Sequence, residues 1–371
     1  MQTILIDTYY HKVAPAGIKT YIEQLVKGSK SSGSDHINYI YSSELKFDRK
    51  KPSVLNSNNR LLRWVFQINY FVWKQFILPF KCLIHKVDVL ICPDYVLPVW
   101  NLKAKKIVVL HDSLFWNNPE YYSLFWRYYY LNLINFGINK KTIIVTTSEY
   151  SKKSLKKVLN INNDIKVIYQ SCSKNNGESF SQINKKNIIH VGSFEKRKNL
   201  LILLQAFLKI KSDKKNNQIK LVLAGSTNFF GQNKELKKIK KFIADNNLNN
   251  EVEITNYLSN KQIQKLYSTA FIYIFPSNSE GFGIPIIESF SNGVPVICSD
   301  LEVFKEIGND SVLTFKQNDV NDLASKIDFL IKFDNKRLEL IKKGFKRIKR
   351  FSIENFINSF EKLYTSSTLN G

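Results

Sequence analysis

Apolar residues recur along the chain in short runs, and these runs alternate with longer segments whose apolar positions have helical spacing. Each run is apolar almost throughout, which is typical of parallel strands that helices cover on both faces. The predicted strands of the first half are Thr3–Ile6, Ile37–Tyr41, Val87–Cys92, Lys106–Leu110 and Thr142–Thr147. Those of the second half are Asn187–Val191, Ile219–Ala224, Glu251–Thr255, Phe271–Phe275, Pro295–Cys298 and Val312–Phe315. The pattern therefore predicts two α/β units, each with a parallel sheet.

A polar segment separates the two sets of strands. Ser171–Ser179 is rich in small residues and has no hydrophobic periodicity, as expected of a linker between domains. We therefore predict one domain over 1–172 and a second over 180–350. Beyond them, the final segment is predicted to be a helix with Ser352 as its N-cap.

Composition narrows the class of protein. The chain has 371 residues, of which 44% are apolar, so it is long enough for two domains and too apolar to be disordered. Its four cysteines include no pair with C-x-x-C spacing, which argues against a disulfide scaffold and against a cysteine-based zinc site.

Basic residues are in large excess, and the formal net charge is +24. Part of the excess lies between Lys46 and Lys106, where only Asp48, Asp88 and Asp94 are acidic. Such a charge suits a polyanionic neighbour, which means nucleic acid, an anionic membrane leaflet or a phosphorylated substrate.

The N-terminal residues lack a basic start, a long apolar run and a cleavage site, so we expect a cytoplasmic protein. The most apolar stretch, Leu61–Phe80, contains too many polar residues to span a bilayer. It does have a broad apolar face at helical spacing. Two interpretations stay open: a core helix of the first domain, which we favour, or a helix lying at a membrane interface. In the first case the basic surface would supply most of any attraction to anionic lipid.

Three loops that follow predicted strands carry candidate chemistry, because ligands of parallel sheets bind at the carboxyl ends of the strands. Ser279–Glu288 follows Phe271–Phe275 and opens a helix, so Gly281 and Gly283 allow close approach of a ligand to backbone amides that favour a phosphate. The competing interpretation is a glycine-rich turn with a capping glutamate.

The second loop, His190–Leu200, brings Arg197 and Lys198 to the start of the predicted helix Leu200–Lys211, where they could receive a diphosphate. A solvated basic loop is the alternative in so basic a chain. In the third loop, His111 follows a strand of the first domain and is next to Asp112, which makes it a candidate site residue.

Together these segments resemble the retaining glycosyltransferases called GT4. The strongest element is the E-x7-E pattern from Glu280 to Glu288, followed by Asn292–Ile297. Supporting elements, in the same order as in that family, are Gly17-Ile18, Trp73-Lys74-Gln75, Leu78-Pro79, His111-Asp112, Pro119-Glu120, Gly192, Arg197–Leu200 and Ala224-Gly225-Ser226. The resemblance implies the GT-B fold, with two Rossmann-like domains that face each other across a cleft, and a last helix, 352–371, that crosses back to the first domain.

The resemblance also implies roles for individual residues. Arg197 and Lys198 would hold the diphosphate of a nucleotide sugar, and Glu288 would accept hydrogen bonds from the ribose. Glu280 would hold the transferred sugar together with the backbone, and His111 would touch that sugar from the first domain. The remaining implied donor-binding positions are Gly17, Gly192, Gly225, Tyr257, Leu258, Gly281, Phe282, Gly283 and Ile284.

These parts suit the breaking of a glycosyl phosphate bond, since fixed cations and helix-end amides stabilise a departing diphosphate. The chain contains no Asp-x-Asp motif, so we expect no metal and no other cofactor. Three departures from the family pattern bear on the donor: Thr255–Leu258 lacks a common glycine, Ser289–Ser291 replaces the usual Ala-Met-Ala, and Ala16-Gly17 stands where a glycine pair is frequent.

The sequence thus favours a bacterial-type, cytoplasmic enzyme, peripheral at the inner face of the plasma membrane. It would move a hexose, mannose or similar, from a nucleotide diphosphate sugar to a saccharide or lipid-linked acceptor in the assembly of O-antigen, capsule or lipopolysaccharide. Alternatives are an epimerase or a phosphorylase on the same fold, or a basic nucleic-acid-binding protein. The scattered basic residues and the lack of a recognition motif argue against nucleic acid as a partner.

Overall fold

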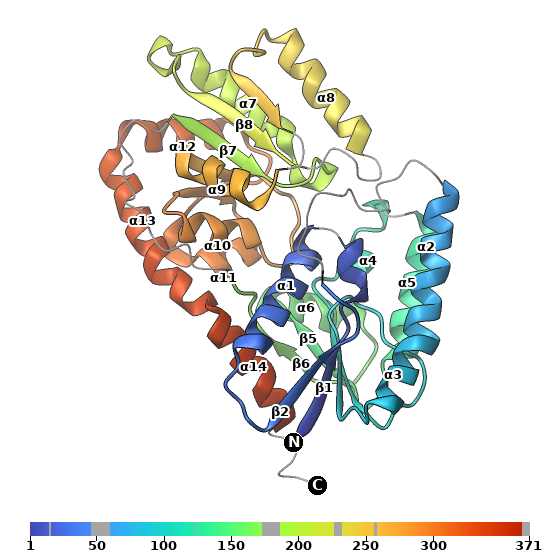
Figure 1. Cartoon of the computed structure of the whole chain (residues 1–371). Helices are drawn as coiled ribbons and strands as arrows, with labels where there is room; N and C mark the ends of the chain where they lie inside the picture. Colours follow the sequence, from blue (N-terminus) through green and yellow to red (C-terminus); the bar gives the residue numbers. More distant parts are fainter. Residues whose placement is uncertain are drawn as a thin grey trace. The chain divides into compact units, whose positions relative to one another are not determined.

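The computed structural model describes residues 1–14, 16–45, 60–121, 123–172, 186–225, 232–255 and 258–365. The chain divides into two compact units, and the first joins Met1–Ser171 to Phe351–Gly371. The second unit is Cys172–Arg350. In the described residues each unit is built on a six-stranded sheet with helices on both faces (Figure 1). The predicted α/β class with two parallel sheets is confirmed.

All strand pairs of the first sheet are parallel, in the order β2-β1-β3-β4-β5-β6. The strands are β1 Gln2–Ile6, β2 Ile37–Tyr41, β3 Val89–Cys92, β4 Lys105–Val109, β5 Ile143–Thr146 and β6 Ile165–Val167. Five of these match predicted strands to within two residues at each end. The sequence pattern missed β6, a three-residue edge strand whose central residue, Lys166, is exposed.

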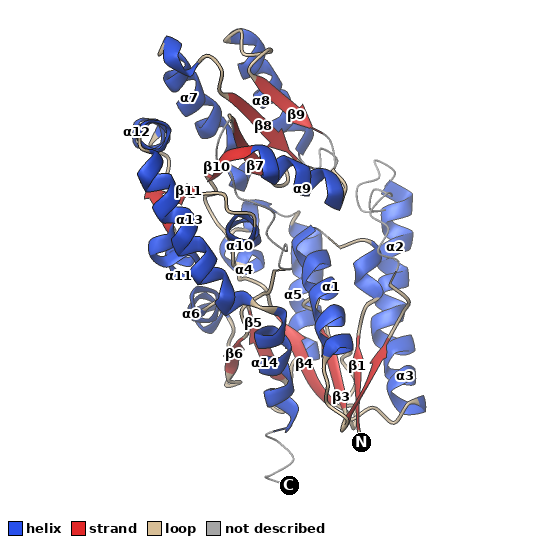
Figure 2. Cartoon of the chain, turned by 60° about the vertical axis from the view of Figure 1, so that its left-hand side comes forward, coloured by secondary structure: helices blue, strands red, loops and turns tan. Residues whose placement is uncertain are grey.

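Helices cover both faces of this sheet (Figures 1 and 2). The α-helices are α1 Ala16–Ser31, α2 Arg60–Val72, α3 Leu78–Ile84, α4 Leu114–Asn117, α5 Leu124–Gly137, α6 Glu149–Val158 and α14 Ile353–Thr365. Short helical turns are η1 Tyr9–Lys12, η4 Pro119–Tyr121 and η8 Lys349–Phe351, and η3 Trp73–Ile77 is a π-helical turn that joins α2 to α3. The α1 and α14 helices share one face with Ile4 and Ile6, while α2, α3, α5 and α6 pack on the other around Leu5. The alternation along β1 fixes which residues face each layer.

The second sheet is also parallel, in the order β12-β11-β10-β7-β8-β9. Its strands are β7 Asn187–Val191, β8 Lys220–Ala224, β9 Val252–Thr255, β10 Ala270–Phe275, β11 Val296–Ser299 and β12 Val312–Phe315. Each corresponds to a predicted strand, and β7 and β12 have the predicted bounds. Renumbered within the unit, this is the 3-2-1-4-5-6 order of dinucleotide-binding sheets.

The helices of the second unit form two layers. They are α7 Leu200–Lys211, α8 Gln232–Asp245, α9 Asn260–Thr269, α10 Ile284–Ser291, α11 Glu302–Gly308, α12 Val320–Lys332 and α13 Asp334–Ile348. The short turns are η5 Lys196–Lys198, η6 Lys214–Asn216 and η7 Asn309–Ser311. The main core lies between the sheet and α7, α8 and α12, where Leu203 and Phe207 contribute from α7. On the opposite face, Phe304 of α11 stacks on Phe275 of β10 with ring centroids 4.6 Å apart.

Each sheet has one point where the strand order reverses, and ligands of open parallel sheets bind at such points. In the first sheet it lies between β1 and β3, and in the second between β7 and β10. The loops after these strands are therefore the places in each unit where chemistry is expected.

Candidate active site

Two loops meet at the reversal point of the second sheet. The loop after β7 carries Glu195, Arg197 and Lys198, and the loop after β10 carries Glu280. The Arg197 Nη1 lies 2.7 Å from Glu280 Oε1, and the Lys198 Nζ lies 2.6 Å from the same oxygen. The sequence patterns had singled out these three residues separately, and the structure brings them together.

The cluster contains a second carboxylate that sequence reasoning missed. Glu195 Oε2 lies 2.6 Å from Arg197 Nε, and Glu195 Oε1 accepts a hydrogen bond from the Ser193 hydroxyl. Its place two residues before Arg197 was the only available signal. With two cations and two carboxylates the cluster is formally neutral, so a diphosphate would compete with carboxylates for Arg197 and Lys198.

Glu280 is ionised in this setting. Burial alone would raise the pKa of its carboxyl group, but the charges of Arg197 and Lys198 outweigh burial and lower the pKa to about 2. Lys198 also lies over the Phe275 ring, 4.9 Å from its centroid, so its ammonium group is held between an aromatic face and a carboxylate.

Hydrogen bonds between amides hold the loops in place. The Asn278 amide donates to Arg197 O at 2.7 Å, and Gln317, from the loop after β12, donates to Asn278 O at 3.0 Å. Asn199 has a left-handed φ of 53° and donates its side-chain amide to Asn278 Oδ1. Asn199 belongs to the predicted Arg197–Leu200 element, where it had no assigned role. Asn278 and Gln317 were not predicted, because their partners lie in distant loops.

The helix that opens after Glu280 begins with a residue that must be glycine. Gly283 has φ of 106°, and a Cβ there would lie 3.2 Å from Phe304. Ile284 and Pro285 form the first helical positions, and the Ile286 amide donates to Gly283 O at 2.9 Å. The Ile286 amide is therefore already hydrogen-bonded within the first turn of the helix.

Glu288 lies on α10, eight residues after Glu280 in the sequence, and is half-buried. It accepts a hydrogen bond from the Tyr267 hydroxyl, with 3.3 Å between Tyr267 Oη and Glu288 Oε2. Both Glu280 and Glu288 raise the pKa of Tyr273, after burial as the main cause, so this tyrosine lies near both carboxylates.

Gly192 and Gly225 bring the loops after β7 and β8 into backbone contact. The Gly192 amide donates to Ala224 O at 2.9 Å, and a Cβ on Gly225 would lie only 1.7 Å from Gly192 O. A Cβ on Gly192 would lie 2.9 Å from Nε2 of the buried His190. Both glycines are therefore required by packing, whatever they bind.

The other predicted donor-binding positions of this unit are spread over two loops. Gly281 and Phe282 are buried between Glu280 and α10, and Leu258 is half-buried just before the Ser259 N-cap of α9. Tyr257 lies outside the described residues.

In the first unit, His111 follows β4 and is buried. Its Nε2 donates to Pro93 O at 2.8 Å, and its ring meets Tyr21 edge-on at 4.7 Å. Burial lowers the pKa of His111 to about 4, so the imidazole is neutral at pH 7. With hydrogen on Nε2, the Nδ1 atom has a lone pair that can accept a hydrogen bond.

Gly17 is the second residue of α1, and a Cβ there would meet nothing within 4 Å. Packing inside the described structure thus gives no reason for glycine at this position. The situation is the opposite of that at Gly192 and Gly225.

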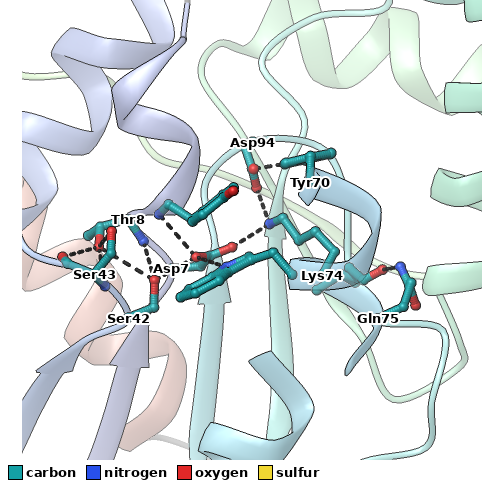
Figure 3. A network of polar contacts seen from close by, with 11 residues as sticks. Asp7, Thr8, Ser42, Ser43, Tyr70, Lys74, Gln75 and Asp94 are labelled. Atoms are coloured by element: carbon teal, nitrogen blue, oxygen red, sulfur yellow. Dashed lines mark hydrogen bonds and ion pairs between the residues drawn. The ribbon is translucent and has the colours of Figure 1, made fainter. Parts of the chain in front are cut away.

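The reversal point of the first sheet holds a buried charge network that the sequence patterns missed (Figure 3). Lys74 Nζ lies 2.6 Å from Asp7 Oδ2, after β1, and 2.6 Å from Asp94 Oδ1, after β3, and all three side chains are fully buried. Tyr70 donates to Asp94, and Ser42 donates to Asp7. Asp7 and Asp94, with Cys92, also have the spacing of metal ligands, but the Lys74 ammonium group lies between the two carboxylates as their cation.

The two aspartates differ electrostatically. Burial would raise the pKa of both, and in Asp7 the charge of Lys74 reverses this effect and lowers the pKa. In Asp94 burial prevails, and the pKa is raised to about 6. Lys74 reaches them because the π-helical turn η3 directs two successive side chains, Lys74 and Gln75, into the interior.

Comparison with known proteins gives the chain its context. Residues 173–347 match the model of the family described as glycosyl transferases group 1. The O-antigen chain mannosyltransferase B of Escherichia coli is 25% identical over 275 residues, which cover 71% of this chain and 70% of that relative.

Solved structures of similar fold cover nearly the whole chain. Sucrose-phosphate synthase from Thermosynechococcus elongatus has a TM-score of 0.72 at 17% identity and covers 100% of both chains. The Anabaena protein HepE in complex with UDP and glucose has a TM-score of 0.71 at 16% identity, and covers 99% of this chain and 100% of its own. The two parallel sheets and the similar solved structures give the chain the GT-B fold, and the match of residues 173–347 to the group 1 family supports a GT4-like glycosyltransferase.

Proposed function

We propose that this glycosyltransferase moves a hexose, mannose or a similar sugar, from a nucleotide diphosphate sugar to a saccharide or lipid-linked acceptor in the assembly of cell-surface polysaccharide. The observation that carries the proposal is the Arg197–Lys198–Glu280 cluster at the reversal point of a dinucleotide-type sheet. The similarity to an O-antigen mannosyltransferase supports mannose as the sugar and polysaccharide as the product.

In the proposed reaction the bond between the anomeric carbon and the phosphate oxygen breaks, and the acceptor hydroxyl oxygen bonds to that carbon. The hydroxyl proton passes to the departing diphosphate. Arg197 and Lys198 would stabilise the charge that develops on the diphosphate. Glu280 would hold the sugar, Glu288 would accept hydrogen bonds from the ribose, and the neutral His111 would accept one from a sugar hydroxyl through Nδ1. The anomeric configuration would be retained, as is typical of GT4 enzymes.

We also propose that transfer needs no divalent metal. The cations that would face the diphosphate in place of a metal are Arg197 and Lys198, for which the diphosphate competes with Glu195 and Glu280. Transfer measured in the presence of EDTA should then equal transfer in the presence of Mg²⁺. A loss of activity with EDTA that Mg²⁺ restores would contradict this part of the proposal.

The enzyme is further proposed to work at the inner face of the plasma membrane, where a lipid-linked acceptor would be found. Within the described residues, no helix combines the length and apolar character needed to cross a bilayer. The net charge of +24 favours attraction to anionic lipid.

The deciding experiment screens nucleotide sugars by calorimetry and then tests product formation on lipid-linked acceptors. Arg197→Ala and Glu288→Ala should weaken donor binding by about tenfold or more, since each removes a charged hydrogen-bonding partner. Lys196→Ala is the matched control, because Lys196 is an exposed lysine in the same loop. Unchanged donor binding in both site variants would show that the proposed site is wrong.

A further inference from the structure

Exposed apolar side chains are concentrated in one region of the first unit. Of the large apolar residues exposed in the described chain, all except Met1, Phe333 and Leu338 lie between residues 61 and 136. They are 38% to 79% exposed. We call them the apolar face: Leu61, Leu62, Trp64, Val65, Ile68, Phe71, Val72, Phe76, Ile77, Phe80, Leu83, Ile84, Val99, Trp100, Leu124, Phe125, Tyr128 and Phe136.

The apolar face is continuous over several elements. Trp64 of α2 contacts Phe125 and Trp126 of α5 with ring centroids 5.7 Å and 5.1 Å apart, and α2 and α5 lie side by side (Figure 1). Phe76 of the π-helical turn contacts Trp100, with ring centroids 6.3 Å apart. A shallow hollow of about 330 Å³ on α5 is lined by Phe125, Tyr128, Tyr129, Asn132, Leu133 and Phe136.

The helices beneath the apolar face already have their core contacts. Tyr70, Leu78 and Cys82 are buried against the first sheet, so the exposed residues form a second apolar side of the same helical run. The interpretation of Leu61–Phe80 as an ordinary core helix is therefore wrong for the exposed apolar residues of this segment, although Tyr70 and Leu78 belong to the core. Exposed apolar surface of this extent marks an interaction site.

Charge indicates which partner the apolar face contacts. No Asp or Glu occurs between residues 60 and 87 or between 121 and 148. Lys81 lies in the last turn of α3 and Lys86 follows that helix, Lys103 follows Trp100 in the chain, and Lys140 and Lys141 follow α5. If two copies paired through this face, lysines would approach lysines without a carboxylate in either stretch to compensate them. An anionic lipid surface satisfies both the apolar and the basic groups.

We propose that the apolar face docks onto a bilayer leaflet that contains anionic lipids, with the side chains of α2, α3 and α5 entering the headgroup and upper acyl region and the lysines contacting phosphates. Tryptophan and tyrosine are the residues that favour this depth. This inference rests on the proposed location at the membrane, and it names the surface that makes the contact. It does not depend on which nucleotide sugar is the donor.

The protein supplies its own reporter for a test. All five tryptophans lie in the first unit, and Trp64 and Trp100 belong to the apolar face. Full-length protein is mixed with vesicles of phosphatidylcholine alone or with added phosphatidylglycerol, and binding is measured by flotation and by tryptophan emission. We expect binding to the anionic vesicles, a blue shift of emission, and quenching by brominated acyl chains.

The decisive variant is Phe80→Gln with Leu83→Gln, which removes two exposed apolar groups from α3. Its binding to anionic vesicles should be weaker than that of the native protein by at least about tenfold, even at low salt. The matched control is Phe333→Gln with Leu338→Gln, which removes the exposed phenylalanine and leucine of the second unit and should bind as the native protein does.

Lys86→Gln with Lys103→Gln tests the electrostatic part, and should reduce binding to anionic vesicles without affecting the weak binding to neutral ones. Equal vesicle binding by the Phe80/Leu83 variant and its control would overturn the proposal. The proposal would also be overturned if the native protein did not bind vesicles and sedimented as a dimer while the Phe80/Leu83 variant sedimented as a monomer. The apolar face would then join two copies of the chain. Donor binding is measured in parallel without lipid: its retention in the Phe80/Leu83 variant separates failure of this surface from failure of the proposed function.

Discussion

Glu280 ties Arg197 and Lys198 together, and it neutralises charge that a diphosphate needs. Replacing Glu280 with Gln changes the formal charge of the cluster from zero to +1. We therefore expect Glu280→Gln to bind the free nucleoside diphosphate more tightly, by about tenfold, and to transfer sugar much more slowly. Calorimetry with the nucleoside diphosphate and a transfer assay measure the two effects.

The matched control for this variant is Glu195→Gln, which also removes one carboxylate from Arg197 but lies outside the E-x7-E pattern. It should tighten diphosphate binding while largely preserving transfer. If both variants transfer sugar at the native rate, Glu280 has no role with the sugar.

Substitution of Gly17 and of Gly225 can distinguish a glycine that packing requires from a glycine that a ligand requires. Gly17→Ala adds a Cβ in open space near the start of a helix, so stability should be unchanged or higher by up to about 1 kcal/mol. We nevertheless expect transfer to fall by about tenfold, because a ligand is the remaining reason for glycine there. Thermal denaturation and initial rates give the two readouts.

Gly225→Ala should behave in the opposite order, with loss of stability first, because its Cβ would overlap Gly192 O. A Gly17→Ala enzyme with native activity would remove Gly17 from the site.

Two buried histidines make the protein sensitive to acid. The pKa of His111 and that of His190 are each lowered to about 4, mainly by burial, from an ordinary 6.5. Between these values the unfolded chain binds more protons, so stability is lost as the pH falls from 6.5 to 4, by up to about 3 kcal/mol for each histidine. Asp94, with its pKa raised to about 6, has the opposite effect and stabilises the folded state as the pH falls over much of this range. It is one group against two histidines, so the net effect is a loss of stability.

His111→Gln should flatten the pH dependence of the unfolding free energy in the first unit, and His190→Gln should do so in the second. Denaturation at pH 4.5 and pH 7 provides the comparison for each variant. An unchanged slope in either would mean that folding does not lower the pKa of the corresponding histidine.

At the scale of elements, the π-helical turn η3 places Lys74 at the centre of the first unit. Lys74→Met would leave Asp7 and Asp94 buried together without their cation. Loss of one member of a buried ion pair costs about 3–5 kcal/mol, and we expect a loss of this size at pH 7. The loss should be smaller at pH 5, where Asp94 binds a proton more readily.

Urea denaturation followed by tryptophan emission measures this effect, because every tryptophan lies in the first unit. The control is Lys81→Met. Lys81 is the half-buried lysine of α3, and its replacement should leave the urea midpoint nearly unchanged. A Lys74→Met midpoint equal to that of the control would show that the network contributes nothing to stability.

The sequence was a good guide to elements that have a continuous apolar signal. Runs such as Asn187–Val191 and Val312–Phe315 have the predicted bounds because they lie between helical layers, where none of their residues is exposed. Strand β6 has no such signal, since it is short and lies at an edge. The outer side of α2 and α3 was misjudged for a related reason: periodicity shows where apolar residues lie on a helix but not whether a neighbour covers them.

At the scale of the whole molecule, the candidate site was predictable where its residues follow one another in a motif. Glu280, Gly283 and Glu288 lie within one loop and helix, and Arg197 and Lys198 are adjacent. The network of Asp7, Lys74 and Asp94 was not predictable, because it joins three distant segments through a π-helical turn that has no sequence signature. The same holds for Asn278 and Gln317, whose role depends on loops that only the sheet brings together.

The path of the chain leads to a prediction for truncation. Tyr21 and Leu25 of α1 share a core with Phe356, Ile357 and Phe360 of α14, so deleting residues 351–371 should unfold the first unit. Tryptophan emission should shift to longer wavelength, while the second unit keeps its nucleotide binding. Native-like emission from the shortened protein would mean that α14 is dispensable for the first core.

Because Met1–Ser171 and Phe351–Gly371 belong to one unit, residues 172–350 are in effect an insert within that unit. A stop codon just before Phe351 would then damage the fold built from Met1–Ser171 and spare the segment translated just before it. During synthesis, Met1–Ser171 must wait with part of its interior uncovered until α14 has left the ribosome.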